Sequence, residues 1–373
     1  MIELPVDLWA RTNAVADALL GPLDRPLPAL VRETSRLYTR ERERLGAPSS
    51  RDVLQARLRF YFARDLPKIA YPLAELATAG RLPKGTWRVL DLGAGLGTTS
   101  VGASLFARQA GLAKRMRLDA IDFSAAALAA LERLAELGVP ATVRTFPLDL
   151  RRFEEPLADE RYDLVLLGLV LNELDEADAL ALLRRARARL APGGAMVILE
   201  PALRELTRRL MALRDRLAGE GWPIFAPCPH RGPCPMRERA RDWCHEERPF
   251  ELPPPFAEVA AAAGLRDRKS TFAYLTLAPG PSLAEAVLLS ADGLTRRVVS
   301  SRLASKGKLE RLVCGADGTL QKVMRLRRHA DEANRGFDEA RRGDLLRYEG
   351  ARAARVGPSE KVARWSLHDP SRD

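Results

Sequence analysis

Residues 87–97 read Trp-Arg-Val-Leu-Asp-Leu-Gly-Ala-Gly-Leu-Gly, and this stretch decides the fold. A short apolar run carries the carboxylate of Asp91, and Gly93, Gly95 and Gly97 follow before a helical pattern at residues 98–109. Glycine lets the backbone approach a ligand closely and adopt φ values that a side chain disfavours. A dinucleotide site has the pattern Gly-x-Gly-x-x-Gly, whereas here the third glycine comes one residue early. We therefore predict a strand, a ligand-binding turn and a helix that differ from a dinucleotide site.

Strand and helix patterns alternate downstream of this loop. Apolar strand patterns occur at residues 118–122, 144–149, 162–171 and 195–200, and helical patterns occur at 124–137, 177–190 and 202–218. The run at 162–171 is apolar throughout, as expected for a strand that is buried on both faces. The alternation predicts an α/β fold with a doubly wound, Rossmann-like parallel sheet.

Other patterns flank this core. Residues 1–80 have helical spacing, and we expect Arg57, Arg59, Arg64 and Lys68 to be solvent-facing positions on surface helices. Residues 221–255 are rich in Pro, Cys, His and Arg and show little periodicity. The expected regions are a helical part at 1–80, the α/β core at 81–220, a Cys-rich insertion at 221–255, the end of the core at 256–280, a basic β-rich region at 281–350 and a flexible tail at 351–373.

The chain is basic, with a formal net charge of +11. The excess is concentrated between Arg296 and Arg328, where ten Lys or Arg residues face only two acids. This favours a polyanionic partner, although a solvated basic face would give the same count. The longest apolar runs are far short of the ~20 residues that a membrane span needs, which excludes a membrane partner. The acidic residues near Met1 are unlike a secretory or transit signal, so we expect a cytoplasmic (bacterial) protein.

The four cysteines suggest a metal site. Cys228, Cys234 and Cys244 lie close together in the insertion, and Cys314 follows in the basic region. In a reducing compartment these are free thiols or ligands rather than disulfides. Four thiolates suit tetrahedral zinc or an iron–sulfur cluster. His230 and His245 are alternative ligands that would favour zinc.

The glycine loop resembles the S-adenosylmethionine methyltransferase motif. The resemblance implies that Asp91, Gly93, Gly95 and Gly97 face the methionine part of the cofactor. It further implies that Asp122 binds the ribose hydroxyls and that Asp149 lies beside the adenine amine. The alternative for Asp122 and Asp149 is that they cap helices at strand–helix turns.

The acceptor side is marked by fewer residues. Leu171-Asn172-Glu173-Leu174 follows the fourth strand, where catalytic motifs of such enzymes often lie. Asn172 is therefore a candidate catalytic residue. The alternative is that it caps the helix at 177–190.

The cysteine segments resemble one family closely. Pro227–Met236 and Asp242–His245, supported by residues 89–97, 171–174 and 312–318, are similar to the methyltransferase-like family of mitochondrial small-ribosomal-subunit protein twenty-two and its bacterial relatives. The resemblance implies a methyltransferase fold that binds small-subunit rRNA or a ribosome assembly intermediate. It also implies a structural 4Fe-4S cluster, with Cys228, Cys234, Cys244 and Cys314 as its ligands. The sequence departs from the family at Arg342, where a tryptophan is usual before Gly-Asp.

Three functions are compatible with these features. They are an S-adenosylmethionine-dependent rRNA methyltransferase, a cluster-stabilised ribosome assembly factor without turnover, and a small-molecule methyltransferase with a zinc module. For the first two functions we expect a basic hairpin to follow RNA phosphates. Its candidate contacts are Lys306, Lys308, Arg311, Lys322, Arg325 and Arg327.

Overall fold

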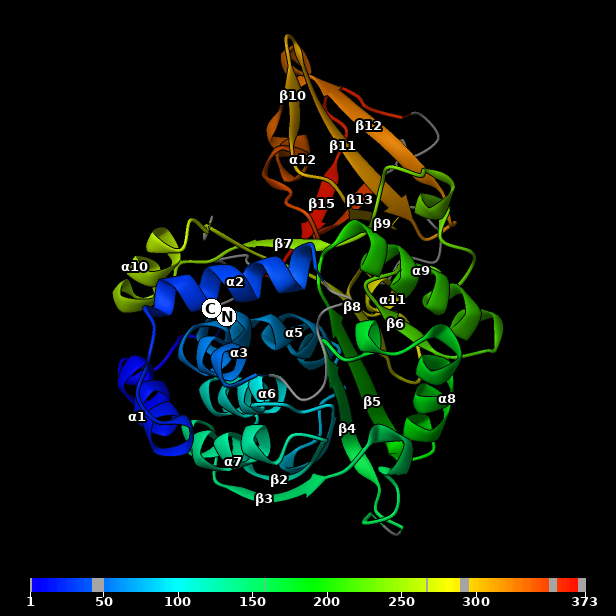
Figure 1. The fold of residues 1–373 in the computed structure, drawn as a ribbon. Helices are drawn as coiled ribbons and strands as arrows, with labels where there is room; N and C mark the ends of the chain where they lie inside the picture. The colour runs from blue at the N-terminus through cyan, green and yellow to red at the C-terminus, as the bar shows by residue number, and fades with distance from the viewer. Residues whose placement is uncertain are drawn as a thin grey trace. The chain divides into compact units, whose positions relative to one another are not determined.

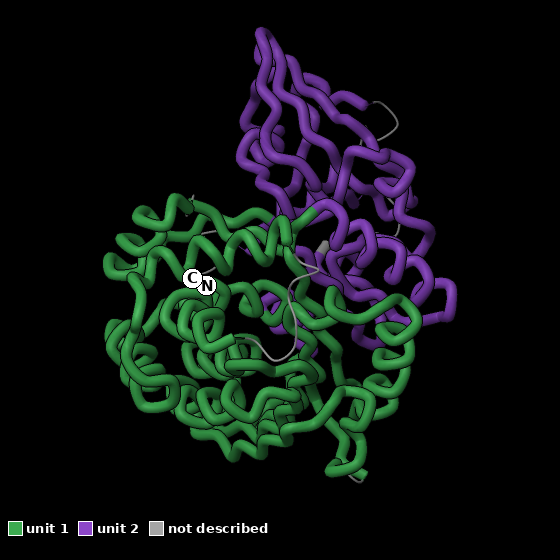
Figure 2. Tube along the Cα trace, viewed as in Figure 1, with its two compact units in different colours: residues 1–73, 82–203, 247–272 green, residues 74–81, 204–246, 273–373 purple. Residues whose placement is uncertain are grey.

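The computed structural model describes residues 2–41, 50–157, 159–265, 268–288, 295–348 and 354–367 (Figure 1). The chain forms two compact units, which Figure 2 shows in green and purple. The first unit contains residues 1–73, 82–203 and 247–272, and the second contains 74–81, 204–246 and 273–373. Each unit is therefore built from three separate stretches of chain. Across the described stretches, no helix has the length and apolarity needed to span a bilayer.

The first unit holds the N-terminal helices and the α/β core. Its helices are α1 (Leu8–Leu20), α2 (Leu27–Thr39), α3 (Arg51–Ala56), the π-helix η2 (Arg57–Tyr61), α4 (Phe62–Asp65), η3 (Leu66–Ile69), the start of α5 (Ala70–Thr78), α6 (Thr98–Gln109), α7 (Ala125–Leu134), η4 (Ala135–Leu137), η5 (Leu150–Arg152), η6 (Leu171–Glu173), α8 (Glu176–Arg187) and α10 (Pro254–Ala262). Its strands are β1 (Gly85–Leu92), β2 (Ala113–Asp122), β3 (Ala141–Pro147), β4 (Tyr162–Gly168), β5 (Leu190–Glu200), most of β7 (Glu246–Pro249) and the start of β8 (Lys269–Leu277).

The second unit holds the Cys-rich segment and the C-terminal strands. Its helices are the end of α5, α9 (Arg204–Gly219), η7 (Pro235–Glu238), α11 (Leu283–Leu288), η8 (Arg327–His329), η9 (Glu332–Asn334) and α12 (Arg335–Glu339). Its strands are β6 (Ile224–Ala226), the end of β8, β9 (Thr295–Val298), β10 (Leu303–Ser305), β11 (Lys308–Gly315), β12 (Leu320–Leu326), β13 (Leu345–Tyr348), β14 (Arg355–Val356) and β15 (Val362–Trp365).

The predicted α/β sheet is confirmed. Strands β3, β2, β1, β4 and β5 pair in that order, and all these pairs are parallel. Because the strands are parallel, their carboxyl ends meet at one edge, which brings Asp91 and Asp122 to the same side of the sheet. Strand β8 follows β5 in the order, and β6 follows β8.

Two details of the sheet differ from the prediction. Strands β6 and β8 pair antiparallel, so the sheet is mixed rather than parallel throughout. The segment between them carries β7 and the Cys-rich loop besides α10, so it is not a simple helical crossover. Strand β5 begins at Leu190 and includes Pro192-Gly193-Gly194, whereas the strand pattern predicted from sequence begins at residue 195. A Cβ on Gly194 would lie 2.8 Å from the carbonyl oxygen of Tyr162, so close backbone approach requires this glycine.

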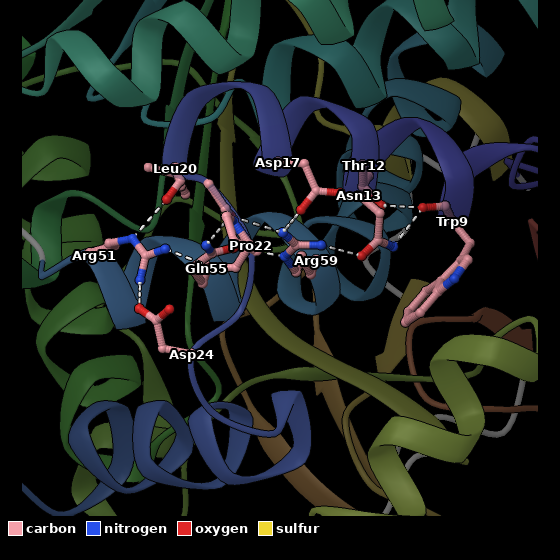
Figure 3. Close-up of polar contacts among 11 residues, drawn as sticks. Trp9, Thr12, Asn13, Asp17, Leu20, Pro22, Asp24, Arg51, Gln55 and Arg59 are labelled. Atoms are coloured by element: carbon pink, nitrogen blue, oxygen red, sulfur yellow. Dashed lines mark hydrogen bonds and ion pairs between the residues drawn. The ribbon is translucent and has the colours of Figure 1, made fainter.

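The N-terminal region is helical, as predicted, but Arg59 does not face solvent. It is 3% exposed, and its guanidinium group bonds Gln55 (2.7 Å), Asn13 (2.6 Å) and Asp17 (2.6 Å), as Figure 3 shows. Helical spacing places Arg59 on the side of η2 that meets α1, so this charge is buried in a network between helices. The prediction that Arg59 is a surface position is wrong.

The C-terminal strands form a small barrel. They pair in the order β14-β12-β11-β9-β13-β15, and β10 extends the pairing of β11. Strands β9, β11 and β12 form an antiparallel meander. Helix α12 then leads to β13, which pairs antiparallel with β9. The last strand is interrupted: β14 pairs β12 in parallel and β15 pairs β13. This connectivity is that of an OB-fold, a five-stranded Greek-key barrel.

The barrel changes the interpretation of the chain's last residues. We expected residues 351–373 to be a flexible tail, but the described part, 354–367, supplies both edge strands. Val356, Val362 and Trp365 are at most 6% exposed. Strands of two and four residues are too short to show a clear alternation in sequence, which explains why the prediction missed them.

Candidate functional site

The glycine loop is shaped by packing on both sides. Gly93, Gly95 and Gly97 all have positive φ, at +73°, +53° and +75°. A Cβ on Gly93 would lie 2.5 Å from Val170 Cγ2, and one on Gly97 would lie 2.5 Å from Leu131 Cγ. Two of the three glycines are therefore needed to fit the loop against its own unit. Gly95 is different because its neighbours are polar side chains.

Asp91 has a buried carboxylate that no well-aligned hydrogen bond and no cation of the described residues satisfies. The residue is 0% exposed, and neither carboxylate oxygen has a hydrogen-bond donor at bonding distance and angle in the described residues. Burial raises the pKa of Asp91 to about 7, the nearby Ser100 opposes the shift, and the Asp122 carboxylate adds to it. Buried polar groups normally have a partner. A cationic ligand group beside Asp91 would supply one.

The other two predicted cofactor-binding acids, Asp122 and Asp149, both accept hydrogen bonds from backbone amides. Asp122 is 8% exposed, and its two carboxylate oxygens accept from Gly95 N and Ser124 N, each at 2.8 Å. Asp149 is half exposed at its side chain and accepts from Arg151 N at 2.8 Å at the start of η5. The structure brings Asp91, the loop and Asp122 together. The ribose and adenine contacts of Asp122 and Asp149 stay predictions.

The ends of β4 and β5 form the neighbouring part of this edge. Leu169 has φ +63°, a conformation that is rare for leucine and costly enough to mark functional sites. Its carbonyl oxygen accepts from Asn172 Nδ2 at 2.6 Å. Glu200 ends β5, is 2% exposed and accepts from Leu171 N at 3.0 Å. Burial raises the pKa of Glu200 to about 7.

Sequence reasoning missed two residues at this edge. Glu200 follows an apolar strand just as Asp122 does, and that repeated pattern was a usable signal. Arg57 was expected to face solvent, yet its guanidinium Nη2 lies 2.8 Å from the position that a Cβ on Gly95 would take. No sequence signal connects Arg57 to a loop almost forty residues away.

The four cysteines line one cavity in the second unit; their role as metal ligands stays a prediction. Cys228 follows β6, Cys234 precedes η7, Cys244 precedes β7, and Cys314 lies on β11. Cys234, Cys244 and Cys314 also pack against one apolar cluster of Met211, Met236 and Val299. The fold therefore brings Cys314 to the three cysteines of the insertion.

The four cysteines are partly buried. Burial raises the pKa of Cys234 to about 11, and the neighbouring Cys228 thiolate raises it further. Burial and then Cys228 also raise the pKa values of Cys244 and Cys314. In the described parts of the chain, no three His, Cys, Asp or Glu side chains are placed to hold a single metal ion.

Arginines of α9 order the Cys-rich segment. Arg208 donates to the carbonyl oxygens of Arg237 (2.8 Å), Arg239 (2.9 Å) and Asp242 (2.9 Å). Arg214 is 3% exposed and donates to the carbonyl oxygens of His230 and Gly232. These bonds hold a segment that has little core of its own, so the cysteines are positioned by protein contacts.

The two candidate histidine ligands differ in position. His230 Nε2 lies 3.6 Å from Cys314 Sγ, and burial, assisted by Arg214, lowers the pKa of His230 to about 4. Its imidazole is therefore neutral at pH 7 and borders the cysteine set. His245 Nδ1 lies 3.2 Å from the carbonyl oxygen of Trp243.

The predicted basic hairpin presents only part of its charge to solvent. Arg311 is 1% exposed and donates to the carbonyl oxygens of Phe337 and Asp338, both at 2.8 Å. Arg325 is 4% exposed and pairs with Asp338. Alternate residues of a strand face opposite sides, and these two arginines face the barrel interior. We therefore remove Arg311 and Arg325 from the predicted RNA contacts.

The remaining predicted contacts lie outside the barrel. Lys306, Lys322 and Arg327 are exposed. Lys308 is partly buried and forms an ion pair with Glu310 at 3.1 Å. The hairpin's outer face is thus basic, but it carries fewer free cations than the sequence count suggests.

A buried ion cluster fixes the second unit. Arg297 donates to Glu75 (2.9 Å), Glu246 (3.0 Å) and the Tyr274 hydroxyl (2.8 Å), and that hydroxyl donates to Glu75 (2.6 Å). All four residues are at most 5% exposed. Arg297 is one of the ten basic residues counted in the sequence, so this charge is structural rather than a surface charge.

We expect Arg297→Met to destabilise the protein by about 3–5 kcal/mol, because it leaves two buried glutamates without their cation. Arg302→Met removes an exposed cation of the same unit and should stay within about 0.5 kcal/mol of the parent. Urea denaturation followed by circular dichroism measures both. Equal stability of the two variants would contradict a structural role for the cluster.

Comparison with known proteins identifies a family. The family model described as mitochondrial small ribosomal subunit Rsm22 matches residues 82–347. No curated protein matches the chain significantly.

Solved methyltransferase structures are similar only at a distance. An O-methyltransferase family protein from Burkholderia thailandensis is 19% identical, with 67% of each chain covered and a TM-score of 0.35. The magnesium protoporphyrin IX methyltransferase of Synechocystis is 15% identical over 69% of this chain and 100% of its own, with a TM-score of 0.35. An rRNA methylase from Streptococcus thermophilus is 15% identical over 55% and 93%, with a TM-score of 0.31. The fold assignment rests on the strand order instead.

Proposed function

This chain belongs to the Rsm22 family of the mitochondrial small ribosomal subunit, and on that premise we propose that it is an S-adenosylmethionine-dependent methyltransferase of small-subunit rRNA. The observation that carries the proposal is the orphaned Asp91 carboxylate beneath a glycine loop. A methionine-type ligand has an ammonium group that would pair with this carboxylate. When bound, S-adenosylmethionine supplies an electrophilic methyl group.

Asp122 and Glu200 support the same proposal. Asp122 already accepts two backbone amides, and a carboxylate has about four acceptor positions, so ribose hydroxyls can still bind there. Glu200 lies at the end of β5 and has a pKa of about 7, which suits a residue that takes a proton from a methyl acceptor. Asn172 holds the strained Leu169 backbone through its amide, which makes it a positioning residue.

The affinity for S-adenosylmethionine is expected to rise between pH 6 and pH 8. Asp91 is mostly protonated below its pKa of about 7, and pairing with a ligand ammonium requires the ionised form. Asp91→Asn should weaken binding by about tenfold or more and remove this pH dependence. Isothermal titration calorimetry measures both effects. The control ligand is 5′-methylthioadenosine, which lacks the ammonium and should show neither effect; a pH profile that Asp91→Asn leaves unchanged would contradict the assignment.

We further propose that Cys228, Cys234, Cys244 and Cys314 hold a 4Fe-4S cluster. A zinc ion with Zn–S bonds of about 2.3 Å needs its four sulfurs within about 4.6 Å of one another. The described side chains do not converge in that way, whereas a cluster binds each thiolate through its own iron. Cys234, whose pKa burial raises to about 11, also fits a site that is completed when metal displaces its proton. Bound there, the cluster would join β11 to the Cys-rich segment.

Anaerobically purified protein is expected to contain about four iron and four sulfide per chain, with absorption near 400 nm. Cys314→Ala removes one ligand and should lower the iron content and the thermal stability together. Ser300→Ala, a small substitution in the same unit, should change neither the iron nor the sulfide. One zinc per chain without sulfide would contradict the cluster and favour the zinc alternative.

The barrel supports a single-stranded RNA partner. OB-folds bind oligonucleotides across their second and third strands and the adjoining loops, which here are β11, β12 and the β10–β11 turn. Arg327 N donates to Gly307 O at 2.9 Å, so η8 lies beside the β10–β11 turn. The exposed cations of this surface are Arg302, Lys306, Lys322, Arg327 and Arg328.

This surface carries exposed cations but no exposed aromatic side chain, among the described residues, on which a base could stack. Within the described parts of the barrel, Phe337, Tyr348 and Trp365 are the aromatic residues, and all three are at most 2% exposed. Loss of solvent contact lowers the pKa of His329, and the positive charges of Arg355, Arg328 and Arg325 lower it further. The surroundings of His329 are therefore positively charged. We therefore infer phosphate contacts with little base preference and strong salt dependence.

Lys306→Ala combined with Arg327→Ala should weaken binding to single-stranded small-subunit RNA about tenfold. The slope of log Kd against log salt should also fall by roughly 1–2, since each single-strand phosphate contact contributes about 0.7. Lys114→Ala with Arg115→Ala removes the same charge from the exposed start of β2 and serves as the matched control. Fluorescence anisotropy at several salt concentrations measures the slopes. Equal losses in both double variants would show a general charge effect and contradict a specific surface.

An assembly factor that binds these ligands without turnover is the second candidate. It is favoured by Asn172, whose amide is occupied by the Leu169 carbonyl rather than directed at an acceptor. Transfer of a labelled methyl group to small-subunit RNA distinguishes it from the enzyme. Binding without transfer would establish the assembly factor.

A further inference from the structure

Arg57 is the first residue of the π-helix η2, directly after α3. Its neighbours Leu58, Arg59 and Phe60 are all buried, whereas Arg57 is only partly buried. π-helical turns are rare and occur often at functional sites, because the extra residue redirects a side chain. Here the side chain reaches the glycine loop of the same unit.

The guanidinium group of Arg57 occupies the space beside Gly95. Its Nη2 atom lies 2.8 Å from the position that a Cβ on Gly95 would take, and Asp122 Oδ2 lies 3.9 Å from the same position. A side chain at residue 95 would push the end of the Arg57 side chain out of this place. The positive φ of +53° favours glycine at residue 95, and the missing Cβ leaves room for the guanidinium group, whereas Gly93 and Gly97 are needed because of apolar packing.

Arg57 also differs from its neighbouring arginines in its partners. Arg59 bonds Gln55, Asn13 and Asp17, and Arg51 bonds carbonyl oxygens and Asp24. The backbone N–H of Arg57 donates to the carbonyl oxygens of Val53 and Leu54, but its side chain makes neither an ion pair nor a hydrogen bond with the described residues. A partly buried cation of this kind is suited to bind an anionic group from outside the chain.

We propose that Arg57 binds the carboxylate of the amino-acid group of S-adenosylmethionine. This inference rests on the proposed function, in which Asp91 pairs with the ammonium of the same group. Together the two residues offer a cation and an anion to a ligand that carries both charges on one carbon. Arginine suits this position because its planar fork can bind a carboxylate through two parallel hydrogen bonds.

The assignment predicts which ligands the site accepts. S-adenosylhomocysteine keeps the ammonium and the carboxylate and should bind through Arg57. 5′-Methylthioadenosine keeps the adenine, ribose and sulfur but lacks the amino-acid group, so Arg57 should contribute nothing to its binding. The difference between the two ligands isolates the contact that Arg57 makes.

Titration calorimetry on the full-length protein tests the assignment. Arg57→Met should weaken S-adenosylhomocysteine binding about 10–100-fold and leave 5′-methylthioadenosine binding within about threefold. Arg57→Lys, which keeps the charge but not the fork, should fall between Arg57→Met and the parent. Arg36→Met removes an exposed cation from α2 of the same unit and should leave both affinities unchanged.

Three results would overturn the assignment. Equal weakening of both ligands by Arg57→Met would indicate that the substitution distorts the loop. Unchanged S-adenosylhomocysteine affinity would show that Arg57 does not bind its carboxylate. A parent protein that binds neither ligand would reject the proposed function itself, and the inference with it.

Discussion

The second unit depends on one buried cation. The unit consists of three stretches of chain: the first contributes Glu75, the second Glu246, and the third both Tyr274 and Arg297. The guanidinium group of Arg297 therefore bonds residues from all three stretches. Arg297 also pairs with Cys314 in the register of β9 and β11. The charge cluster and the cysteine cavity are therefore adjacent on the same strands. A change that loosens the cluster would move a candidate metal ligand as well.

The first unit shows a different arrangement, in which two carboxylates are buried without an ion pair among the described residues. Asp91 lies near the carboxyl end of β1 and Glu200 ends β5 of the same sheet. Burial raises the pKa of each carboxyl group to about 7. Burying a carboxylate without a partner costs stability. The glycine loop, the strained Leu169 and the half-buried Arg57 surround this same edge. Buried carboxylates and a strained backbone residue therefore lie at the same edge of the sheet, where a charged ligand would stabilise them.

The sequence was sufficient to predict the elements with strong local signals. The strand before Gly93, the parallel core of the sheet and the family all follow from motifs or from long apolar runs. Several of the errors concern charged residues, because a helical or alternating pattern of arginines appears the same on a surface as in a buried network. Arg59, Arg311 and Arg325 are buried for this reason. Only tertiary contacts show which arginine has a carbonyl or carboxylate beside it.

The barrel of the second unit can be completed only late in synthesis, because its last strands lie near the end of the described chain. Strands β14 and β15 complete its two edges, and they end at Trp365. The first unit contains no residue beyond 272, so its full sheet core can form while the barrel is still incomplete. Until residue 365 has left the ribosome, β12 and β13 have unpaired edges that are open to other chains. A nascent chain would thus hold a finished glycine-loop edge before it has a finished barrel.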